Sequence, residues 1–349
     1  MIVRRSFFVE KLKMEDIARM ANVSRSAVSI ALNGKAGISQ ETREKIFKVI
    51  NENGYEPLRK RNKKTKQLPV TIHFIIISNN QGMVTQNFQT LPFFNSLISI
   101  ISNDVSQDGR NLQIDIIDGK NLKSDLEKLV NENKVQAALV LATELTRKDV
   151  ILLDKIIPNV VFIDTCYPDL AMDFVTMDNY QGAYQAGKHI INKGYKRIAY
   201  AASNKRIANF EERKRGFYQA LYDMDYRIDE QDYFMISPTR LNPDEKEPLE
   251  LINRVSLPDA IFCEDDYIAI RLIKEFNLNG IRVPKDVAVM GFDDIYEGTL
   301  ISPELTTIKV PLEKLVEQVL NQLQSKINDD KWVARKTLIT TSVIERNSL

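Results

Sequence analysis

The stretch MEDIARMANVSRSAVSIAL, residues 14–32, determines how the rest of the chain is interpreted. Its apolar residues recur at helical spacing in two short segments joined by a tight turn, which predicts two packed helices. Ser24 is placed to cap the second helix, and Arg25 and Ser26 at the start of that helix are expected to face outward with Arg19 and Ser29. The expected inward set is Ile17, Ala18, Ala21, Val23, Val28 and Leu32. The pattern favours a helix-turn-helix over an ordinary helical hairpin, which would have the same apolar spacing.

A third helix follows this pair. Ser39 precedes a run in which Ile46, Val49 and Ile50 share one face, and Glu41 lies in its first turn. From ARMANVSRSAVSIALNG (18–34) through ISQETREKIFKVINENGYEP (38–57), the segment closely resembles the head of the LacI/GalR family of bacterial transcription regulators. The resemblance implies a helix-turn-helix DNA-binding domain at residues 13–57, preceded by an N-terminal extension, 1–12, to which we assign no function.

Charge is unevenly distributed along the chain. Residues 1–66 hold 16 Lys and Arg against 7 Asp and Glu, which gives +9, so the remainder carries −8 of the net +1. A basic head on an acidic body is typical of a nucleic-acid-binding protein with a separate regulatory module. The basic linker, residues 58–69, is expected to contact DNA phosphates.

Composition excludes several classes of protein. At 349 residues and 44% hydrophobic content, the chain should hold two or three domains. Cys166 and Cys263 are far apart, and the two histidines form no ligand pattern, so we expect no disulfide framework, no metal and no other cofactor. No apolar run approaches the roughly 18 residues of a membrane span, and residues 1–13 lack a signal-peptide core. We therefore expect a cytoplasmic protein that does not bind membranes.

From residue 70 onward, strand and helix patterns alternate. The near-continuous apolar run VTIHFIII (70–77) is typical of a strand buried on both faces of a parallel sheet. Further strands are predicted at LQIDII (112–117), VQAALVL (135–141), NVVFID (159–164), RIAYAA (197–202), AIFCED (260–265) and VAVMGF (287–292). This alternation predicts a doubly wound α/β body, and its length of about 280 residues exceeds one such sheet, so we expect two lobes with a cleft.

The family resemblance extends over this body. The matching blocks, in family order, are LPFFNSLISII (91–101), VVFID (160–164), DNYQGAYQAGKHIINKGYKRIAY (178–200), ERKRGFYQAL (212–221), DAIFCEDDYIAI (259–270), VAVMGFDD (287–294), SPELTTI (302–308) and VIERNS (343–348). They imply an effector-binding and dimerisation core at 70–349 that is like the periplasmic sugar-binding proteins. Lobe 1 would comprise about 70–176 and 309–340, and lobe 2 about 177–308 and 341–349.

Carboxylates cluster at predicted strand ends, where a doubly wound sheet opens its ligand crevice. Asp164, Asp265 and Asp293 could there accept paired hydrogen bonds from vicinal hydroxyls. Asp266 is expected to cap the next helix instead of contacting ligand. By resemblance, Arg213 matches the effector-contacting Arg, and Phe94 matches an aromatic position near the ligand, although a core role for Phe94 is equally open. The expected effector-binding set is Phe94, Asp164, Arg213, Asp265 and Asp293.

The predicted cavity is more acidic than the family pattern. Asp265 stands where the family more often has Asn, and Thr165 where it often has Arg. This favours a neutral or amino sugar over a phosphorylated effector.

At the DNA end, Arg25 and Ser26 occupy the positions that the family varies to choose operators. Arg25 could read guanine through O6 and N7. Ile30 replaces a common Arg, and Lys64 stands where the family has a Leu that wedges into the minor groove, so we expect an unusual operator and a charged tether. The expected DNA-binding set is Ser24, Arg25, Ser26, Ser29, Ile30, Asn33, Arg59, Arg61, Lys63 and Lys64.

Together these features predict a homodimeric, sequence-specific transcription regulator, a repressor of carbohydrate-utilisation genes controlled by a small sugar-like effector. Two heads are expected on double-stranded DNA with a palindromic operator, because one head reads only a half-site. No tetramerising helix follows VIERNSL, which favours a dimer. Two alternatives stay open: a cytoplasmic solute-binding protein, and a regulator whose core responds to a partner protein. No Gly-rich phosphate loop or nucleophile with a base is visible, so we expect no enzymatic activity.

Overall fold

The computed structural model describes residues 12–32, 37–53, 55, 70–79, 82–85, 87–238 and 256–349. The chain divides into two compact units, Met1–Lys66 and Gln67–Leu349. The first unit is called the head and the second the core.

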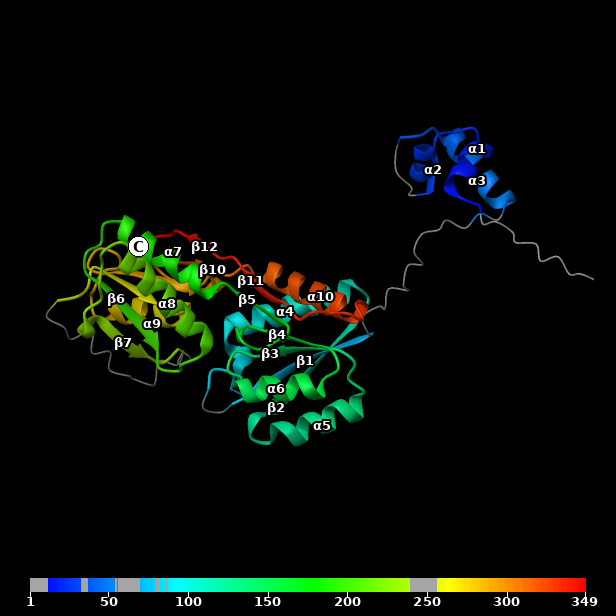
Figure 1. Ribbon diagram of the computed structural model, residues 1–349. Helices are drawn as coiled ribbons and strands as arrows, with labels where there is room; N and C mark the ends of the chain where they lie inside the picture. Colours follow the sequence, from blue (N-terminus) through cyan, green and yellow to red (C-terminus); the bar gives the residue numbers. More distant parts are fainter. Residues whose placement is uncertain are drawn as a thin grey trace, which may run out of the picture. The chain divides into compact units, whose positions relative to one another are not determined.

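The head is a bundle of three short helices. They are α1 (Met14–Met20), α2 (Arg25–Leu32) and α3 (Gln40–Glu52) (Figure 1). The side chains buried between them are those of Ile17, Ala18, Ala21, Val28, Ala31, Ile46, Ile50 and Tyr55. Val23 and Leu32 lie half-buried at the edge of this cluster. The predicted helix-turn-helix and its third helix are confirmed.

Side-chain caps fix where the head helices begin. The hydroxyl oxygen of Ser24 accepts the amide N–H of Ala27 at 3.1 Å, and that of Ser39 accepts the amide N–H of Thr42 at 3.2 Å. Each bond satisfies one of the backbone donors that a helix leaves unpaired at its start. The predicted cap at Ser24 is therefore present, and Ser39 caps the helix that it was predicted to start.

The first lobe of the core, lobe 1, is built on a six-stranded parallel sheet in the order β11-β5-β4-β3-β1-β2. Its strands are β1 (Thr71–Ser78), β2 (Asn111–Asp118), β3 (Ala138–Leu141), β4 (Val160–Ile163), β5 (Phe174–Met177) and β11 (Lys336–Ile339). Helices α4 (Pro92–Gln107) and α10 (Leu312–Asn328) cover one face, and α5 (Leu122–Asn133) and α6 (Arg147–Ile156) cover the other (Figure 1). Alternate residues of β1 pack on opposite faces, since Phe74 and Ile76 belong to one apolar cluster and Ile75 and Ile77 to another.

Lobe 2 repeats the plan, with the strand order β12-β10-β9-β8-β6-β7. The strands are β6 (Ile198–Ser203), β7 (Tyr233–Ile236), β8 (Ala260–Cys263), β9 (Ala288–Asp293), β10 (Thr306–Lys309) and β12 (Ser342–Ile344), of which β12 alone is antiparallel to its neighbour. Helices α7 (Asn179–Asn192) and α8 (Ala208–Asp223) pack together on one face, and α9 (Asp266–Leu278) lies on the other.

The chain passes between the lobes three times. It leaves the first sheet after β5, returns after β10 through α10 to β11, and crosses again in the two residues between β11 and β12 (Figure 1). The predicted two-lobed doubly wound α/β core is confirmed, including all seven predicted strands. None of the described helices is long and apolar enough to cross a membrane.

Candidate functional sites

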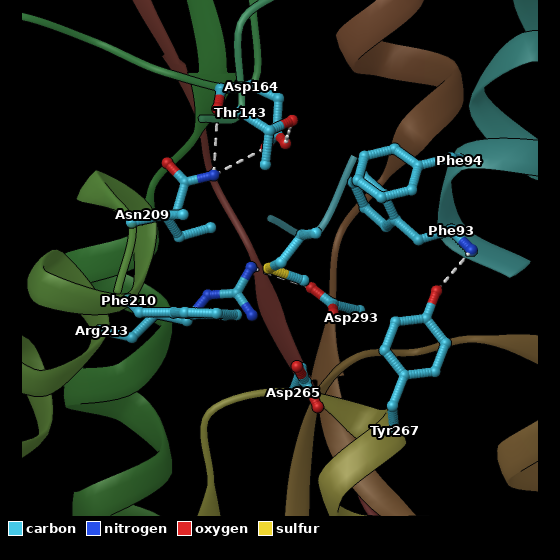
Figure 2. Close-up of a pocket in the computed structure, with 12 residues that line it drawn as sticks. Phe93, Phe94, Thr143, Asp164, Asn209, Phe210, Arg213, Asp265, Tyr267 and Asp293 are labelled. Carbon is cyan, nitrogen blue, oxygen red and sulfur yellow. Dashed lines mark hydrogen bonds and ion pairs between the residues drawn. The ribbon is translucent and has the colours of Figure 1, made fainter. Parts of the chain in front are cut away.

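A cavity of about 30 Å³ lies where the two lobes meet, at the carboxyl ends of their strands. Figure 2 shows side chains of both lobes pointing into it. The residues that line it are Met83, Phe93, Phe94, Thr143, Asp164, Ile207, Asn209, Phe210, Arg213, Asp265, Tyr267 and Asp293. All five residues predicted to bind an effector are among them. This volume is well below the roughly 300–1,000 Å³ of small-molecule sites, so the lobes must move apart to admit a sugar.

Asp164 is the polar contribution of lobe 1. It follows β4, has φ +64° and is buried. One carboxylate oxygen accepts the hydroxyl of Thr143 at 2.6 Å, and the other accepts the side-chain N–H of Asn209, from α8 of lobe 2, at 2.7 Å. Burial raises the pKa of Asp164 to about 6. Asp164 therefore joins the two lobes across the cavity.

Arg213, on α8, is the only cation among the residues that line the cavity. Its guanidinium donates to the Asn179 side-chain oxygen at 2.9 Å, to the Glu264 backbone carbonyl at 2.6 Å and to the Asp293 carboxylate at 2.9 Å. It also lies 3.7 Å from the centroid of the Phe292 ring. A planar group with this many contacts has one available orientation, so Arg213 is held rigidly toward the cavity.

Close packing of α7 against α8 makes this arrangement possible. A Cβ atom at Gly216 would lie only 2.1 Å from the backbone oxygen of Tyr180. Glycine is therefore required there, one helical turn after Arg213, for the Arg213 side chain to reach Asn179 at the start of α7.

Asp293 ends β9 with a backbone φ of +124°, a conformation that residues with a side chain rarely adopt. Burial raises the pKa of its carboxyl to about 6, although the neighbouring Arg213 guanidinium opposes the shift. Strained conformations of this kind cluster at ligand sites, where the surrounding packing maintains them. Both Asp164 and Asp293 have positive φ, and both point into the same cavity (Figure 2).

The prediction for Asp266 is wrong, because the cap of α9 is Asp265. One Asp265 carboxylate oxygen accepts the amide N–H of Ile268 at 2.8 Å. Asp266 is the first residue of the helix, and its buried carboxylate accepts the backbone N–H of Ile295 and the hydroxyl of Thr307. Asp265 nonetheless lines the cavity, because its second oxygen is not used by the cap.

Aromatic rings form the rest of the cavity wall. Phe93 and Phe94 pack edge to face at the start of α4, with ring centroids 5.5 Å apart. The Tyr267 hydroxyl accepts the backbone N–H of Phe93 at 2.9 Å, which is a second hydrogen bond between the lobes. Phe94 both lines the cavity and belongs to the apolar core, so the two predicted roles are compatible. Phe210 lies beside the Arg213 guanidinium.

Sequence reasoning missed Thr143, Asn209 and Tyr267. Each takes its role from a partner on a distant strand or helix, and a single polar residue in an otherwise ordinary segment carries no signal of that kind. Thr143 lies two residues after β3, at the strand end where polar side chains were expected, and this was the available indication.

In the head, the start of α2 presents polar side chains. Arg25 and Ser26 are exposed, and the Arg25 guanidinium lies 3.1 Å from the Glu15 carboxylate with both side chains about two-thirds exposed. Such a surface pair is weak, so DNA can replace it at little cost. Ser24 lies at the same helix end, with its hydroxyl oxygen 2.8 Å from that of Ser26.

The remaining predicted DNA contacts differ in position. Ser29 and Ile30 are half-buried along α2, which leaves part of each side chain at the surface. Asn33, Arg59, Arg61, Lys63 and Lys64 lie outside the described residues.

A helix-turn-helix head on the same chain as a two-lobed core with a polar cavity defines the class of ligand-responsive DNA-binding proteins. Comparison with known families agrees. Residues 13–57 match the model of bacterial regulatory proteins of the lacI family, and residues 188–349 match a periplasmic binding protein-like domain.

Similar proteins cover nearly the whole chain. The transcriptional regulator GalR of Salmonella typhimurium strain LT2 is 27% identical over 87% of this chain and 86% of its own. The repressor PurR of Aliivibrio fischeri is 27% identical over 96% and 98%. These matches confirm the resemblance of this chain to the lacI family of bacterial regulatory proteins.

Solved structures with the same fold include a complex of the regulator CelR with cellobiose, which has a TM-score of 0.67 at 23% identity and covers 97% of this chain and 100% of its own. A second is the lac repressor dimer bound to operator and the anti-inducer ONPF, with a TM-score of 0.67 at 18% identity over 97% and 99%. At these identities the likeness concerns the fold.

Proposed function

We propose that this protein is a homodimeric repressor of carbohydrate-utilisation genes, which binds a palindromic operator and is controlled by a small sugar-like effector held between the lobes of the core. The match of residues 13–57 to the lacI family model supports the operator-binding part of the proposal, and so do the exposed Arg25 and Ser26 at the start of α2. A dimer is proposed because one small head reads only a half-site. Its place of action would be the cytoplasm, where operator DNA lies.

One observation carries the effector part of the proposal: polar groups from both lobes converge on one cavity in a chain that also has a DNA-binding head. Asp164 comes from lobe 1, and Arg213 and Asp293 come from lobe 2. Carboxylates and a guanidinium around aromatic rings suit a ligand with several hydroxyl groups and apolar ring faces. The sugar bound by CelR is an example of such a ligand in a protein of this fold.

The proposed mechanism is a shift between two arrangements of the lobes. An effector that binds one arrangement more tightly than the other increases the population of that arrangement, by as much as its two affinities differ. In a dimer this would change the distance or orientation of the two heads and hence the affinity for a palindrome.

We propose that the effector is released from the cavity without being chemically converted. The lining carboxylates Asp164 and Asp293 are both hydrogen-bonded to protein donors, which suits binding more than proton transfer. A candidate sugar incubated with the purified protein should be recovered intact by chromatography. Consumption of the sugar would contradict this part of the proposal.

The decisive experiment is selection of fragmented genomic DNA by the purified full chain, followed by sequencing of the retained fragments at two salt concentrations. Recovery of a palindrome beside sugar-uptake or glycosidase genes is the expected result. Retention of unrelated sequences that is lost at modest salt would mean that the basic residues supply affinity without specificity, and would contradict the proposal.

Control by an effector is then tested on the recovered palindrome. Fluorescence anisotropy of the labelled operator should change when the sugar transported or cleaved by the neighbouring gene products is added. A matched sugar of different configuration serves as the control. If neither sugar changes operator binding, while the protein binds the palindrome tightly, the core responds to something other than a sugar.

A further inference from the structure

The cavity between the lobes carries an unbalanced charge. Three carboxyl groups line it, those of Asp164, Asp265 and Asp293, against the single guanidinium of Arg213. All four side chains are at least nine-tenths buried. With every group ionised the lining has a formal charge of −2, in a place where water can screen little of it.

Two of the three carboxylates already have good partners. Asp293 bonds to the Arg213 guanidinium at 2.9 Å, and Asp164 accepts hydrogen bonds from Thr143 and Asn209. Arg213 itself commits three of its five N–H donors to protein acceptors. The Arg213 guanidinium is therefore already paired with neighbouring protein groups.

Asp265 differs from both of them. One of its oxygens caps α9 through the amide N–H of Ile268, but the second, Oδ2, has no hydrogen-bond partner among the described residues although the side chain is only 1% exposed. Leaving a buried acceptor of this kind unpaired is costly, and the cost is larger for a charged group. Figure 2 shows this carboxylate at the cavity, below Arg213 and Asp293 in the view.

A metal ion does not explain the arrangement. In the part of the chain that the structure describes, no group of three or more His, Cys, Asp or Glu is placed to hold one. A single donor with several N–H groups fits better, since one unused oxygen is available and aromatic residues line the same cavity.

We infer that the effector is a sugar that carries a free amino group, and that Asp265 Oδ2 binds its ammonium. The inference rests on the proposed function and names the chemical class of its ligand. An ammonium donates up to three hydrogen bonds, brings the missing positive charge and makes a charge-assisted bond to Oδ2. Phe94 and Tyr267, which line the same cavity, would supply the apolar wall for the sugar ring.

Other ligand charges fit the cavity less well. A neutral hydroxyl would supply a donor to Oδ2 but no positive charge to favour the ionised carboxylate. A phosphate would add further negative charge. Burial raises the pKa of Asp265 well above its usual range in the empty cavity, and an ammonium beside it would favour the carboxylate.

The test compares three forms of one sugar on the full chain. Glucose, glucosamine and N-acetylglucosamine, and the same three forms with the galactose and mannose configurations, are titrated by calorimetry and ranked by the rise in melting temperature. The N-acetyl form keeps the nitrogen but removes its charge. In at least one configuration the amine should bind at least tenfold more tightly than both neutral forms, as expected for a charge-assisted hydrogen bond.

The variant Asp265→Asn locates the effect. An Asn side-chain oxygen can still accept the Ile268 N–H and cap α9, so the variant should fold. It should lose tenfold or more in affinity for the amine and change its affinity for the neutral sugar by no more than about twofold. Asp294→Asn is the matched control, because Asp294 directly follows β9 and pairs with Arg346 at 2.5 Å without lining the cavity.

Each outcome decides the inference. The inference is overturned if a neutral form binds equally or more tightly, or if the Asp265→Asn variant keeps its preference for the amine. Neither result would contradict the proposal of a sugar effector. If no form of any of the three sugars binds, the inference fails together with the sugar effector, whereas operator binding is judged separately by the selection of genomic DNA.

Discussion

Replacing Arg213 by Met tests whether the buried ion pair organises the cavity. The substitution keeps an unbranched apolar stem but removes the guanidinium and its three hydrogen bonds, to Asn179, Glu264 and Asp293, at 2.9, 2.6 and 2.9 Å. Removing one partner of a buried pair costs roughly 3–5 kcal/mol, because the other charge stays buried without compensation. We expect Arg213→Met to lose about that much stability at pH 7.5.

The cost should depend on pH. Without Arg213 the carboxyl of Asp293 has its pKa raised further, so at pH 5 it becomes protonated and no longer carries a buried charge. The loss of stability should therefore be smaller at pH 5 than at pH 7.5. At roughly 2–4 °C per kcal/mol for a domain of this size class, the expected fall in melting temperature at pH 7.5 is on the order of 10 °C.

A double-mutant cycle isolates the pair. Asp293→Asn alone leaves Arg213 with an amide acceptor, and the double variant Arg213→Met/Asp293→Asn has no unpaired charge. We expect the double variant to be more stable than Arg213→Met, with a coupling energy of roughly 2 kcal/mol. Unfolding is followed by circular dichroism and by the fluorescence of Trp332, which is the single tryptophan of the chain and lies in the core.

Additive losses of stability in the two single variants would show that Arg213 and Asp293 are not coupled. If the two single substitutions add within about 0.5 kcal/mol, or if Arg213→Met costs less than about 1 kcal/mol at pH 7.5, the pair does not organise the cavity. The same variants should keep their affinity for operator but lose the response to effector, as measured by anisotropy.

Three further predictions concern the head and the cavity. Arg25→Ala should lower discrimination at one base pair of each half-site by roughly 1–3 kcal/mol, measured by competition between operator variants, whereas Arg19→Ala on α1 should leave base preference unchanged. Ser24→Ala should destabilise the head by roughly 1 kcal/mol through loss of the α2 cap and weaken operator binding, and full affinity in the variant would contradict the cap's role. Raising the pH from 4 to about 7 should destabilise the core. The folded state holds protons on Asp164 and Asp293, with pKa values near 6, whereas the unfolded state releases them near 3.8. A melting temperature that rises over this window in wild type, or that falls equally in Asp164→Asn, would contradict the prediction.

Local signals made most of the fold predictable from the sequence. The caps at Ser24 and Ser39 involve residues three positions apart, and the apolar run of β1 needs no partner to be recognised. The strands that were not predicted are β5, β7, β10, β11 and β12. Such strands are defined by their neighbours, as when β5 pairs with β11 across more than 150 residues of chain, and so they carry no pattern of their own.

The cavity was only partly predictable for the same reason. Carboxylates at strand ends were visible in the sequence, but which of Asp265 and Asp266 caps α9 depends on where the helix begins and on distant donors. Asp266 is held by Ile295 and Thr307, about 30 and 40 residues away, which leaves the cap to Asp265. Competition of this kind between local and long-range partners cannot be judged from one segment.

The hydrogen bonds between the lobes limit what an effector can do. Asn209 bonds to Asp164 at 2.7 Å and the Phe93 amide bonds to Tyr267 at 2.9 Å, so the lobes are bridged on two sides of the empty cavity. Each such bond contributes roughly 1 kcal/mol, and about 1.4 kcal/mol corresponds to a tenfold change in the population of the two arrangements. A ligand that touched lobe 2 alone would bind both arrangements equally and shift nothing, however tight its binding. An effective ligand must therefore contact lobe 1 as well as Asp265, and we expect sugars long enough to reach Asp164 to change operator binding, while shorter amines that bind only beside Asp265 do not.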